Sequence, residues 1–244
     1  MLNRMKEDIN AAFQNDPAAR SKLEVILCYP GVHALWLYRI SHYLWKKRWI
    51  VLSRFISHIS RFLTGVEIHP AATIGHGVFI DHGMGVVIGE TAVVGDGCLI
   101  YKGVVLGGTT TERTKRHPEL GKKVIVGSNA CILGNITVGD HVRIGSGSVV
   151  VKNVPPYATV VGVPGRIIEQ KKKEHDATLD HGQLPDPIAE ALKIVLIENR
   201  KLRERIKKLE ENLHISTKED DYVSETESKL MTIFMKNYKD GEGI

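Results

Sequence analysis

The stretch EIHPAATIGHGVFIDHGMGVVIGETAVVGDGCLIYKGVVL, residues 67–106, decides the fold, because an apolar residue returns in it at almost every sixth position. The same spacing continues to residue 150, and glycine often follows the apolar residue. The positions on this grid are Ile68, Ile74, Ile80, Ile88, Val94, Ile100, Leu106, Leu120, Val126, Ile132, Val138, Ile144 and Val150. A period of six fits neither an α-helix nor a simple strand alternation. It is typical of a β-solenoid, in which short strands joined by tight turns stack coil upon coil.

This pattern predicts which residues fill the solenoid. We expect the apolar residue of each hexad to point inward, and the glycine after it to occupy a position where a Cβ atom would clash. Cys98 lies where neighbouring hexads carry small apolar residues, so it is expected to be a core thiol. The prolines of VPPYATVVGVPGRII (154–168) are expected to end the repeat, since proline cannot join a strand ladder.

The grid is interrupted twice, and both interruptions carry ionisable residues. The first places two extra residues within DHGMGV (81–86), and the second places eight within GGTTTERTKRHPE (107–119). Insertions in a solenoid project from its surface and commonly carry function. We therefore expect the active site at Asp81, His82 and the basic residues of the second insertion.

A histidine at the first interruption suits proton transfer. Because imidazole titrates near neutrality, a neutral His82 can take a proton from a hydroxyl as that oxygen attacks. Such a base needs a partner on its other ring nitrogen, and Glu67, fifteen residues earlier, is expected about one coil away. The sequence has no GxSxG nucleophile motif, so direct transfer between two bound substrates is favoured over a covalent enzyme intermediate.

Residues 1–66 are expected to form helices, because apolar residues recur at helical spacing in three stretches. These are MKEDINAAF (5–13), VHALWLYRISHYLW (32–45) and WIVLSRFISHISRFL (49–63). Asp16-Pro17 is expected to cap a helix, and Tyr29-Pro30-Gly31 to separate two helices. The segment 49–63 is basic and apolar, which suits packing on neighbouring helices, on another subunit, or on a membrane surface.

The C-terminal part changes character. After a polar linker over 169–187, apolar residues recur at alternating steps of four and three over 188–213, with Asn199 in one of the apolar slots. This favours a heptad helix, either in a short coiled coil whose register the asparagine fixes or folded back on the same subunit. Residues 214–244 are expected to be a flexible tail.

Composition argues against several classes of protein. The formal net charge is +5, but the basic residues are spread out and not interleaved with aromatic residues. Nucleic acid is therefore not expected as a partner. The excess positive charge is better explained by attraction of a phosphorylated cofactor. We expect neither a signal peptide nor a membrane-spanning segment, because the first residues show no charged stretch followed by an apolar run and no window of eighteen apolar residues occurs. With three cysteines expected to be free thiols, we expect a cytoplasmic protein.

Five strings carry a resemblance to a known family. They are DPAA (16–19), GVHALWLYRISHYLW (31–45), EIHPAATIGHGVFIDHGMGVVIGETAVVGD (67–96), LGGTTTERTKRHP (106–118) and GSGSVVVKNVPPYATVVGVPGRI (145–167). Together they closely resemble the serine O-acetyltransferases, which are hexapeptide-repeat acyltransferases. The resemblance implies an α+β chain, with an N-terminal helical domain over 1–66 and a left-handed parallel β-helix over 67–168. The heptad helix departs from the family pattern.

The resemblance also implies a reaction and its machinery. An acetyl group would pass from acetyl-coenzyme A to the hydroxyl of L-serine, giving O-acetylserine and coenzyme A in cysteine biosynthesis. His82 matches the general base. Glu67 stands where other members carry aspartate as the partner that orients this histidine, so its longer side chain changes the geometry.

The residues that match serine contacts come from separate parts of the chain. Asp16 and Asp81 match the carboxylates that hold the ammonium group of serine. Arg116 and His117 match the pair at the serine carboxylate, where a forked donor is apt. Glu90 matches a residue near this pocket.

The remaining expectations concern the cofactor and the assembly. Gly108, Ser128 and Ser146 match small residues that line an acetyl-coenzyme A groove between two subunits, and Arg166 is a candidate for a coenzyme phosphate. No metal is expected. The resemblance implies trimers or hexamers, feedback inhibition by cysteine, and a tail whose last residue, Ile244, docks into cysteine synthase.

Three other functions fit the sequence less well. The first is a hexapeptide acetyltransferase that acts on a sugar or an antibiotic, and the RHP string and the N-terminal helical domain argue against it. A zinc carbonic anhydrase would need three converging histidines, for which His69, His76 and His82 supply the count. The last is a catalytically inactive partner of cysteine synthase.

Overall fold

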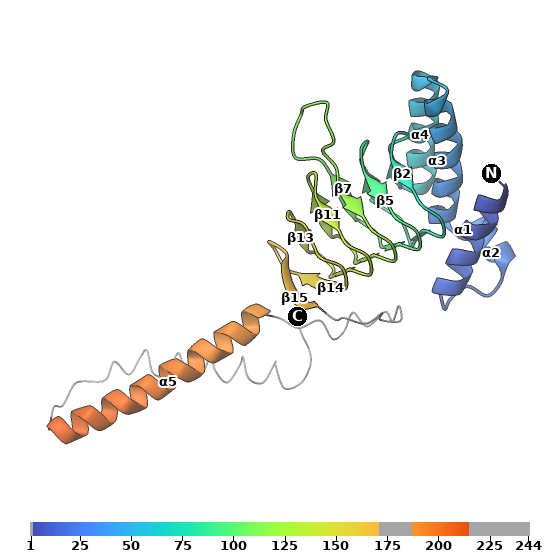
Figure 1. Ribbon diagram of the computed structural model, residues 1–244. Helices are drawn as coiled ribbons and strands as arrows, with labels where there is room; N and C mark the ends of the chain where they lie inside the picture. Colours follow the sequence, from blue (N-terminus) through green and yellow to red (C-terminus); the bar gives the residue numbers. More distant parts are fainter. Residues whose placement is uncertain (1, 171–186, 215–244) are drawn as a thin grey trace. The chain divides into compact units, whose positions relative to one another are not determined.

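Short parallel strands wind into three sheets in the first part of the chain (Figure 1). The computed structural model describes residues 2–170 and 187–214. By its internal contacts the chain divides into a unit that ends at Pro185 and a second that begins at Asp186, and each is described by itself.

The strands are only two to five residues long, and they fall into three ladders. Sheet A contains β1 (Glu67–Ile68), β4 (Val87–Ile88), β7 (Val105–Gly107), β10 (Cys131–Leu133) and β13 (Val149–Val150). Sheet B contains β2 (Thr73–Ile74), β5 (Val93–Val94), β8 (Glu119–Leu120) and β11 (Thr137–Val138). Sheet C contains β3 (Phe79–Ile80), β6 (Leu99–Ile100), β9 (Ile125–Val126), β12 (Arg143–Ile144), β14 (Ala158–Val161) and β15 (Arg166–Gln170). The chain visits sheets A, B and C in turn, so one circuit is one coil. The solenoid predicted from the six-residue period is confirmed.

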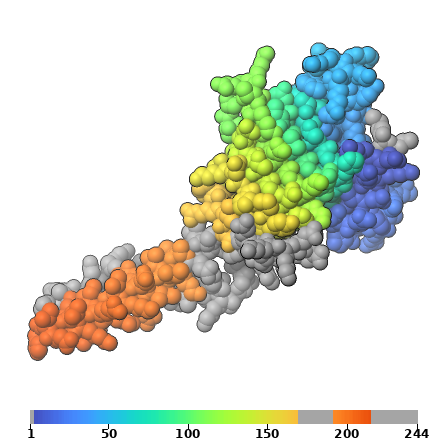
Figure 2. All heavy atoms as spheres, viewed as in Figure 1, coloured from blue at the N-terminus to red at the C-terminus, as the bar shows by residue number. Residues whose placement is uncertain are grey.

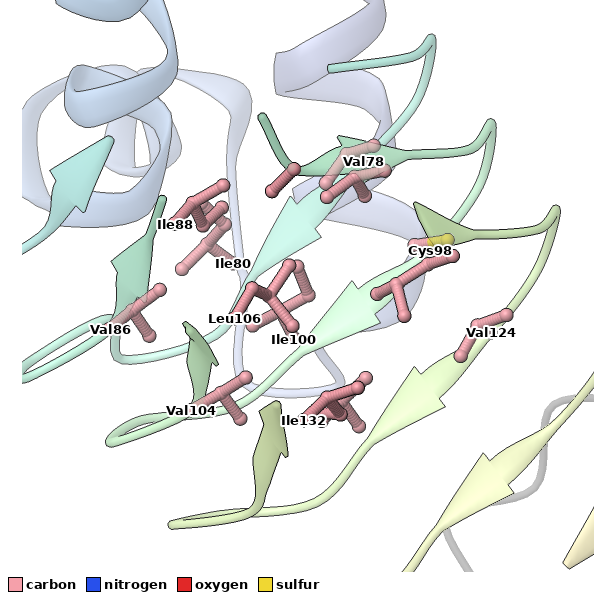
Figure 3. Close-up of a cluster of buried hydrophobic side chains, with 14 of the residues drawn as sticks. Val78, Ile80, Val86, Ile88, Cys98, Ile100, Val104, Leu106, Val124 and Ile132 are labelled. Carbon is pink, nitrogen blue, oxygen red and sulfur yellow. The ribbon is translucent and has the colours of Figure 1, made fainter. Parts of the chain in front are cut away.

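The predicted interior is also confirmed. All thirteen grid residues are buried, none with more than 6% of its surface exposed. They stack in register, so that Ile68 pairs with Ile88 and Ile88 with Leu106 along sheet A. Figure 3 shows side chains of this core from strands of sheets A and C and from the residues that precede those strands. Full burial of one such side chain contributes about 1.5–3 kcal/mol.

The glycines after the grid residues are required by coil stacking. A Cβ atom added at Gly95 would lie 2.3 Å from the carbonyl oxygen of Gly121 in the next coil. The left-handed backbone of one turn instead falls two residues later, where it is adopted by Gly97 and, in later coils, by Lys123 and His141. The expected steric role is therefore correct, but the clash is with the neighbouring coil.

Four helices precede the solenoid. They are α1 (Leu2–Asn15), α2 (Lys22–Cys28), α3 (Pro30–Lys46) and α4 (Ile50–Thr64). Tyr29 separates α2 from α3 as predicted, but Pro30 and Gly31, also predicted to lie between the helices, form the first turn of α3. The predicted helix cap at Asp16 is wrong: its carboxylate accepts from the Ala18 amide in a turn, and Ser21 is the N-cap of α2. The short helix α2 was not predicted, because seven residues carry little periodicity.

Sheet C carries a second apolar cluster on its outer side. Phe79, Leu99 and Ile125 point away from the interior and pack with residues of α1, α2 and α3. A buried ion pair between Asp8 of α1 and Arg39 of α3 fixes these two helices to each other. The helices therefore form one body with the start of the solenoid.

Helix α4 is amphipathic in the opposite sense from most surface helices. Its buried side consists of Ser53, Ser57, Ser60 and Thr64, and the Ser57 hydroxyl donates to the carbonyl oxygen of Ile68. Its apolar residues face outward, Phe62 among them with 86% of its surface exposed. Small side chains let α4 approach the solenoid closely, and its apolar face is left exposed by the described residues.

The parallel repeat ends within residues 154–168, as the prolines suggested. Pro155 and Pro156 precede β14, which still joins sheet C in parallel. Pro164 lies in the turn to β15, which pairs antiparallel with β14. Each proline thus lies outside a ladder position. The antiparallel strand β15 extends to Gln170, two residues beyond the predicted boundary at residue 168.

The second unit contains helix α5 (Pro187–Leu213), which covers the segment of the heptad pattern. Most of the predicted linker 169–187 and almost all of the predicted tail 214–244, Ile244 included, lie outside the described residues. None of the helices among the described residues has the length and apolar character needed to cross a membrane.

Replacing Gly95 by alanine tests the stacking constraint. The methyl group would meet backbone atoms that cannot move without separating two coils, so we expect destabilisation of roughly 1–3 kcal/mol or more, measured by urea unfolding. Gly77→Asn is the matched control, because nothing lies within 4 Å of its Cβ position and asparagine tolerates the φ of +60°. Equal stability of Gly95→Ala and the wild type would contradict this account.

Candidate active site

The first interruption of the grid forms an acidic corner, made of Asp16, Tyr29, Asp81 and His82, where the chain turns from sheet C to sheet A. The Tyr29 hydroxyl donates to Asp16 at 2.5 Å. Burial raises the pKa of Asp81, and the nearby Asp16 carboxylate raises it further, while His82 opposes the shift. Two carboxylates thus lie near each other in a partly buried place, as a binding site for a cation would require.

His82 is presented to solvent. Its backbone is left-handed, with φ of 59°, and 75% of its side chain is exposed. Its Nε2 atom lies 3.9 Å from the Asp81 carboxylate. The following glycines, Gly83 and Gly85, also have positive φ, so the two inserted residues are absorbed by a tight sequence of left-handed turns that projects the imidazole outward.

Glu67 lies beside this corner. The side chain of Val66, its chain neighbour, lies against Gly83 of the His82 loop, so the expected proximity in the fold is present. The Glu67 carboxylate forms an ion pair with Arg61 of α4 at 3.1 Å. The orientation of His82 by Glu67 therefore stays a prediction.

The second interruption forms a basic corner, made of His69, Glu90, Thr91, Arg116 and His117, where the chain turns from sheet A to sheet B. Arg116 donates to the Glu90 carboxylate at 2.6 Å, and this bond holds the pKa of Glu90 below its usual range. The rest of the inserted loop is exposed and projects as a thin finger (Figure 2).

Thr91 organises this corner, and the sequence analysis did not single it out. Its hydroxyl oxygen accepts from the backbone amides of Arg116 and His117 at 3.0 and 3.1 Å. It also lies 2.9 Å from Nδ1 of His117. One threonine thus fixes the end of the long loop. Only its place directly after Glu90, in the string GET, would have drawn attention to it.

Both histidines of the basic corner are held neutral. Burial lowers the pKa of His69 to about 4, and the nearby Arg54 adds to this effect. Burial and the adjacent Arg116 lower the pKa of His117. His69 Nδ1 accepts from the Ala71 amide at 3.0 Å, which requires that nitrogen to be unprotonated. Arg116 is therefore the cation that this corner offers to a ligand.

The two corners lie at opposite ends of the strands of sheet A. The acidic corner leads into β4, whereas Glu90 and Thr91 follow its last residue. At about 3.3 Å per residue, the path from Gly85 to Glu90 amounts to roughly 16 Å of chain. A single small substrate is too short to contact both corners of one chain.

Three of the four cofactor candidates lie on the same edge as His82. Ser128 and Ser146 follow β9 and β12 at the position that His82 occupies after β3, since these strands stack in sheet C. Arg166 pairs with Val161 at the end of that sheet. Gly108 lies instead at the basic corner, where an added Cβ would meet Arg116 at 3.1 Å.

The three histidines considered for zinc do not converge. His69 follows β1, His76 follows β2 and His82 follows β3, so each lies at a different corner of the first coil. His76 pairs with Glu7 at 2.7 Å, and His69 packs edge-on against Trp45. Within the described ranges, no group of three His, Cys, Asp or Glu side chains is arranged to hold a metal ion.

Comparison with known proteins identifies the family. Residues 117–152 match the family of the bacterial transferase hexapeptide (six repeats). The chain is 56% identical over 192 residues to a serine acetyltransferase of Staphylococcus xylosus, covering 79% of this chain and 89% of that protein. It is 53% identical to one of Synechococcus elongatus, covering 87% and 84%. The chain belongs to the serine acetyltransferases.

Solved structures of the family agree with this fold. The serine acetyltransferase of Neisseria gonorrhoeae in complex with serine is 42% identical, with a TM-score of 0.67 over 69% of each chain. A serine acetyltransferase in complex with cysteine is 43% identical, with a TM-score of 0.69 over 70% of this chain and 66% of that one. The hexapeptide-repeat fold with N-terminal helices is therefore shared with these acetyltransferases.

The neutral state of His69 predicts an acid limit of stability. Its folded pKa of about 4 lies below the usual 6.5, so between these values the unfolded chain binds more protons, and stability falls as the pH drops from about 6.5 to 4. His69→Asn keeps an acceptor for Ala71 without titrating, so its melting temperature should fall less between pH 7 and pH 4.5.

The control for this experiment is His58→Asn on the exposed side of α4. Its melting temperature should follow the wild-type dependence on pH. An identical acid loss in His69→Asn and the wild type would remove His69 as a cause.

Proposed function

We propose that this protein transfers the acetyl group of acetyl-coenzyme A to the hydroxyl of L-serine, releasing O-acetylserine and coenzyme A for cysteine biosynthesis. The observation that carries the proposal is an exposed histidine beside two carboxylates, in a chain more than half identical to a serine acetyltransferase. The family's solved complexes with serine and with cysteine support an amino acid as the ligand.

His82 is the general base in this proposal. Its neutral imidazole takes the proton of the serine hydroxyl as the oxygen attacks the thioester carbonyl carbon. The tetrahedral intermediate then collapses, the carbon–sulfur bond breaks, and the imidazolium returns the proton to the departing thiolate. The enzyme ends unchanged, and no covalent enzyme intermediate forms.

The two corners divide the recognition of serine. Asp16 and Asp81 are close enough for one carboxylate to raise the pKa of the other, and together they suit the ammonium group. Arg116, steadied by Glu90 and by the Thr91 bond to its amide, suits the carboxylate, with His117 beside it. Because the corners lie at opposite ends of sheet A, the acidic corner of one subunit must meet the basic corner of another.

This division favours a trimer of side-by-side solenoids, with the left-handed coil that the family resemblance implies. Each of three equivalent interfaces would then hold one complete site. The outward apolar face of α4, with Val51, Phe55 and Phe62 exposed, supports pairing of trimers into hexamers through the helical domains.

Acetyl-coenzyme A is proposed to lie along the edge that carries His82. Ser128 and Ser146 occupy equivalent positions on successive coils, and their small side chains admit close approach of a ligand. Exposed Arg166, beyond them, suits a coenzyme phosphate. Gly108 contributes at the opposite corner, which a neighbouring subunit would bring to the same groove. A metal has no part in this reaction.

The remaining proposals concern regulation and location. Cysteine, which differs from serine by one atom, is proposed to inhibit by occupying the same two corners. Ile244 is proposed to dock into cysteine synthase, whose site accepts an amino-acid carboxylate. Free thiols, such as the exposed Cys28, and the use of acetyl-coenzyme A fit the cytoplasm.

Thiol release from acetyl-coenzyme A tests the function directly. We expect release that depends on L-serine and not on L-alanine, which has the same ammonium and carboxylate groups but no hydroxyl. His82→Asn should fold normally, since asparagine tolerates its left-handed backbone, and should lose about 10²–10⁴-fold in kcat. Near-normal kcat in this variant would show that His82 is not the base, and release without serine would overturn the proposed acceptor.

The proposed role of Glu67 in orienting His82 can be separated from its ion pair with Arg61. If Glu67 orients His82, Glu67→Gln should lower kcat and alter its pH profile while the KM for serine changes less. Arg61→Gln breaks the same ion pair and should leave kcat near the wild-type value. Identical behaviour of the two variants would reduce Glu67 to a surface partner of Arg61.

A further inference from the structure

Helix α5 presents a continuous apolar seam that is exposed in the described part of the chain. The seam runs through Leu192, Val195, Asn199, Leu202, Ile206, Leu209 and Leu213, at alternating steps of three and four. Its apolar members keep between 48% and 66% of their surface exposed. A helix in water depends on packing of its apolar face for most of its stability, so this seam requires a partner.

The spacing assigns heptad positions. A step of three leads from position a to position d, so Leu192, Asn199, Ile206 and Leu213 are a residues, and Val195, Leu202 and Leu209 are d residues. Position g, just before a, holds Glu198 and Arg205. Position e, just after d, holds Arg203 and Glu210.

We propose that α5 pairs with the α5 helices of other copies of this chain in a parallel, in-register coiled coil. In such a coil each g residue faces the e residue five positions later on its neighbour. Glu198 then meets Arg203 of the next helix, and Arg205 meets Glu210. Both contacts join opposite charges, so the flanks of the seam are complementary to themselves.

An antiparallel pair fits the same residues poorly. There g faces g and e faces e, so Glu198 opposite Arg205 requires one alignment and Arg203 opposite Glu210 requires another. Position a also packs against d in that arrangement, which would bury the Asn199 amide against an apolar side chain at a cost. In the parallel arrangement Asn199 meets Asn199, and this contact fixes the register.

The number of strands is three, a point that rests on the proposed trimeric enzyme. Three subunits around one axis present three α5 helices with the same polarity. Leu196 at an e position and Ala191 at a g position widen the apolar face, which suits more than two strands. The helix would thus tie the subunits together outside the solenoid.

Cross-linking of the full-length protein tests the arrangement. In a Cys28→Ser background, which removes the exposed native thiol, Leu209→Cys places a thiol on the seam near the C-terminal end of α5. Lys207→Cys, two residues away at an outward b position, is the matched control. Mild oxidation should convert most of the Leu209→Cys protein into disulfide-linked dimers on a denaturing gel, and little of the control.

Equal cross-linking of both variants, or of neither, would overturn the proposal in favour of a helix folded back on its own subunit. An antiparallel coil in which Glu198 faces Arg205 is detected in the same way, because residue 209 of one helix would then lie far from residue 209 of the next. The alignment in which Arg203 faces Glu210 brings the two residues 209 close together, but Glu198 takes no part in it, so the next readout separates it from the parallel coil. A charge exchange adds a second readout. Glu198→Arg should reduce the cross-linked fraction, and adding Arg203→Glu should restore it; failure to restore it would remove the proposed pairing.

Enzyme activity separates this proposal from the proposed function. Leu202→Glu should abolish the cross-link through Leu209→Cys while serine-dependent thiol release persists at high protein concentration. If the wild type released no thiol with serine, the function would fail, and the cross-linking result would still decide the coil.

Discussion

The stacking of each coil on the one before it, through parallel backbone hydrogen bonds, is the constraint on which the first unit depends. The amide of Glu67 donates to Val86, and that of Val87 donates to Val104, at 2.8 and 2.9 Å. Such a ladder fixes the spacing between coils. It forces apolar residues into vertical columns and leaves no room for a Cβ atom at positions such as Gly95. The six-residue period of the sequence follows from this stacking.

A stack of this kind has rigid edges, and those edges carry the chemistry. Two extra residues at one edge place His82 in a left-handed turn beside Asp81. Eight extra residues at another edge bring Arg116 back onto Glu90 and Thr91. In both places the loop is fastened to the coil beneath it, so a change of loop length supplies reactive groups without disturbing the ladder. The same edge then offers repeated small residues, Ser128 and Ser146, for an extended cofactor.

Two apolar helix faces and a divided site among the described residues have no counterpart there. Helix α4 packs its small polar residues against the solenoid and exposes its phenylalanines, and α5 exposes its heptad seam. The two halves of the proposed serine site also lie at opposite ends of one sheet. These features agree with the proposed symmetric assembly, of which the folded unit would be only a part. Catalysis and association would then use the same surfaces, because a site divided between corners exists only where subunits meet.

The sequence by itself determined the solenoid, its thirteen inward residues, three of the four N-terminal helices and the segment occupied by α5. Each of these rests on a repeating pattern, because the spacing of apolar residues along the chain indicates which positions are buried. The candidate residues at both interruptions came partly from the broken period and partly from family resemblance, and their roles stay predictions.

Only the tertiary structure decided the contacts that no period records. Asp16 proved to bond Tyr29 and a turn amide instead of capping a helix, because the chain folds back to form the acidic corner. Thr91 emerged as the residue that fixes Arg116 and His117, although twenty-five residues separate it from Arg116 in the chain. The three histidines proved to lie at three corners. Such facts depend on how distant segments meet in space, and spacing along the chain does not contain them.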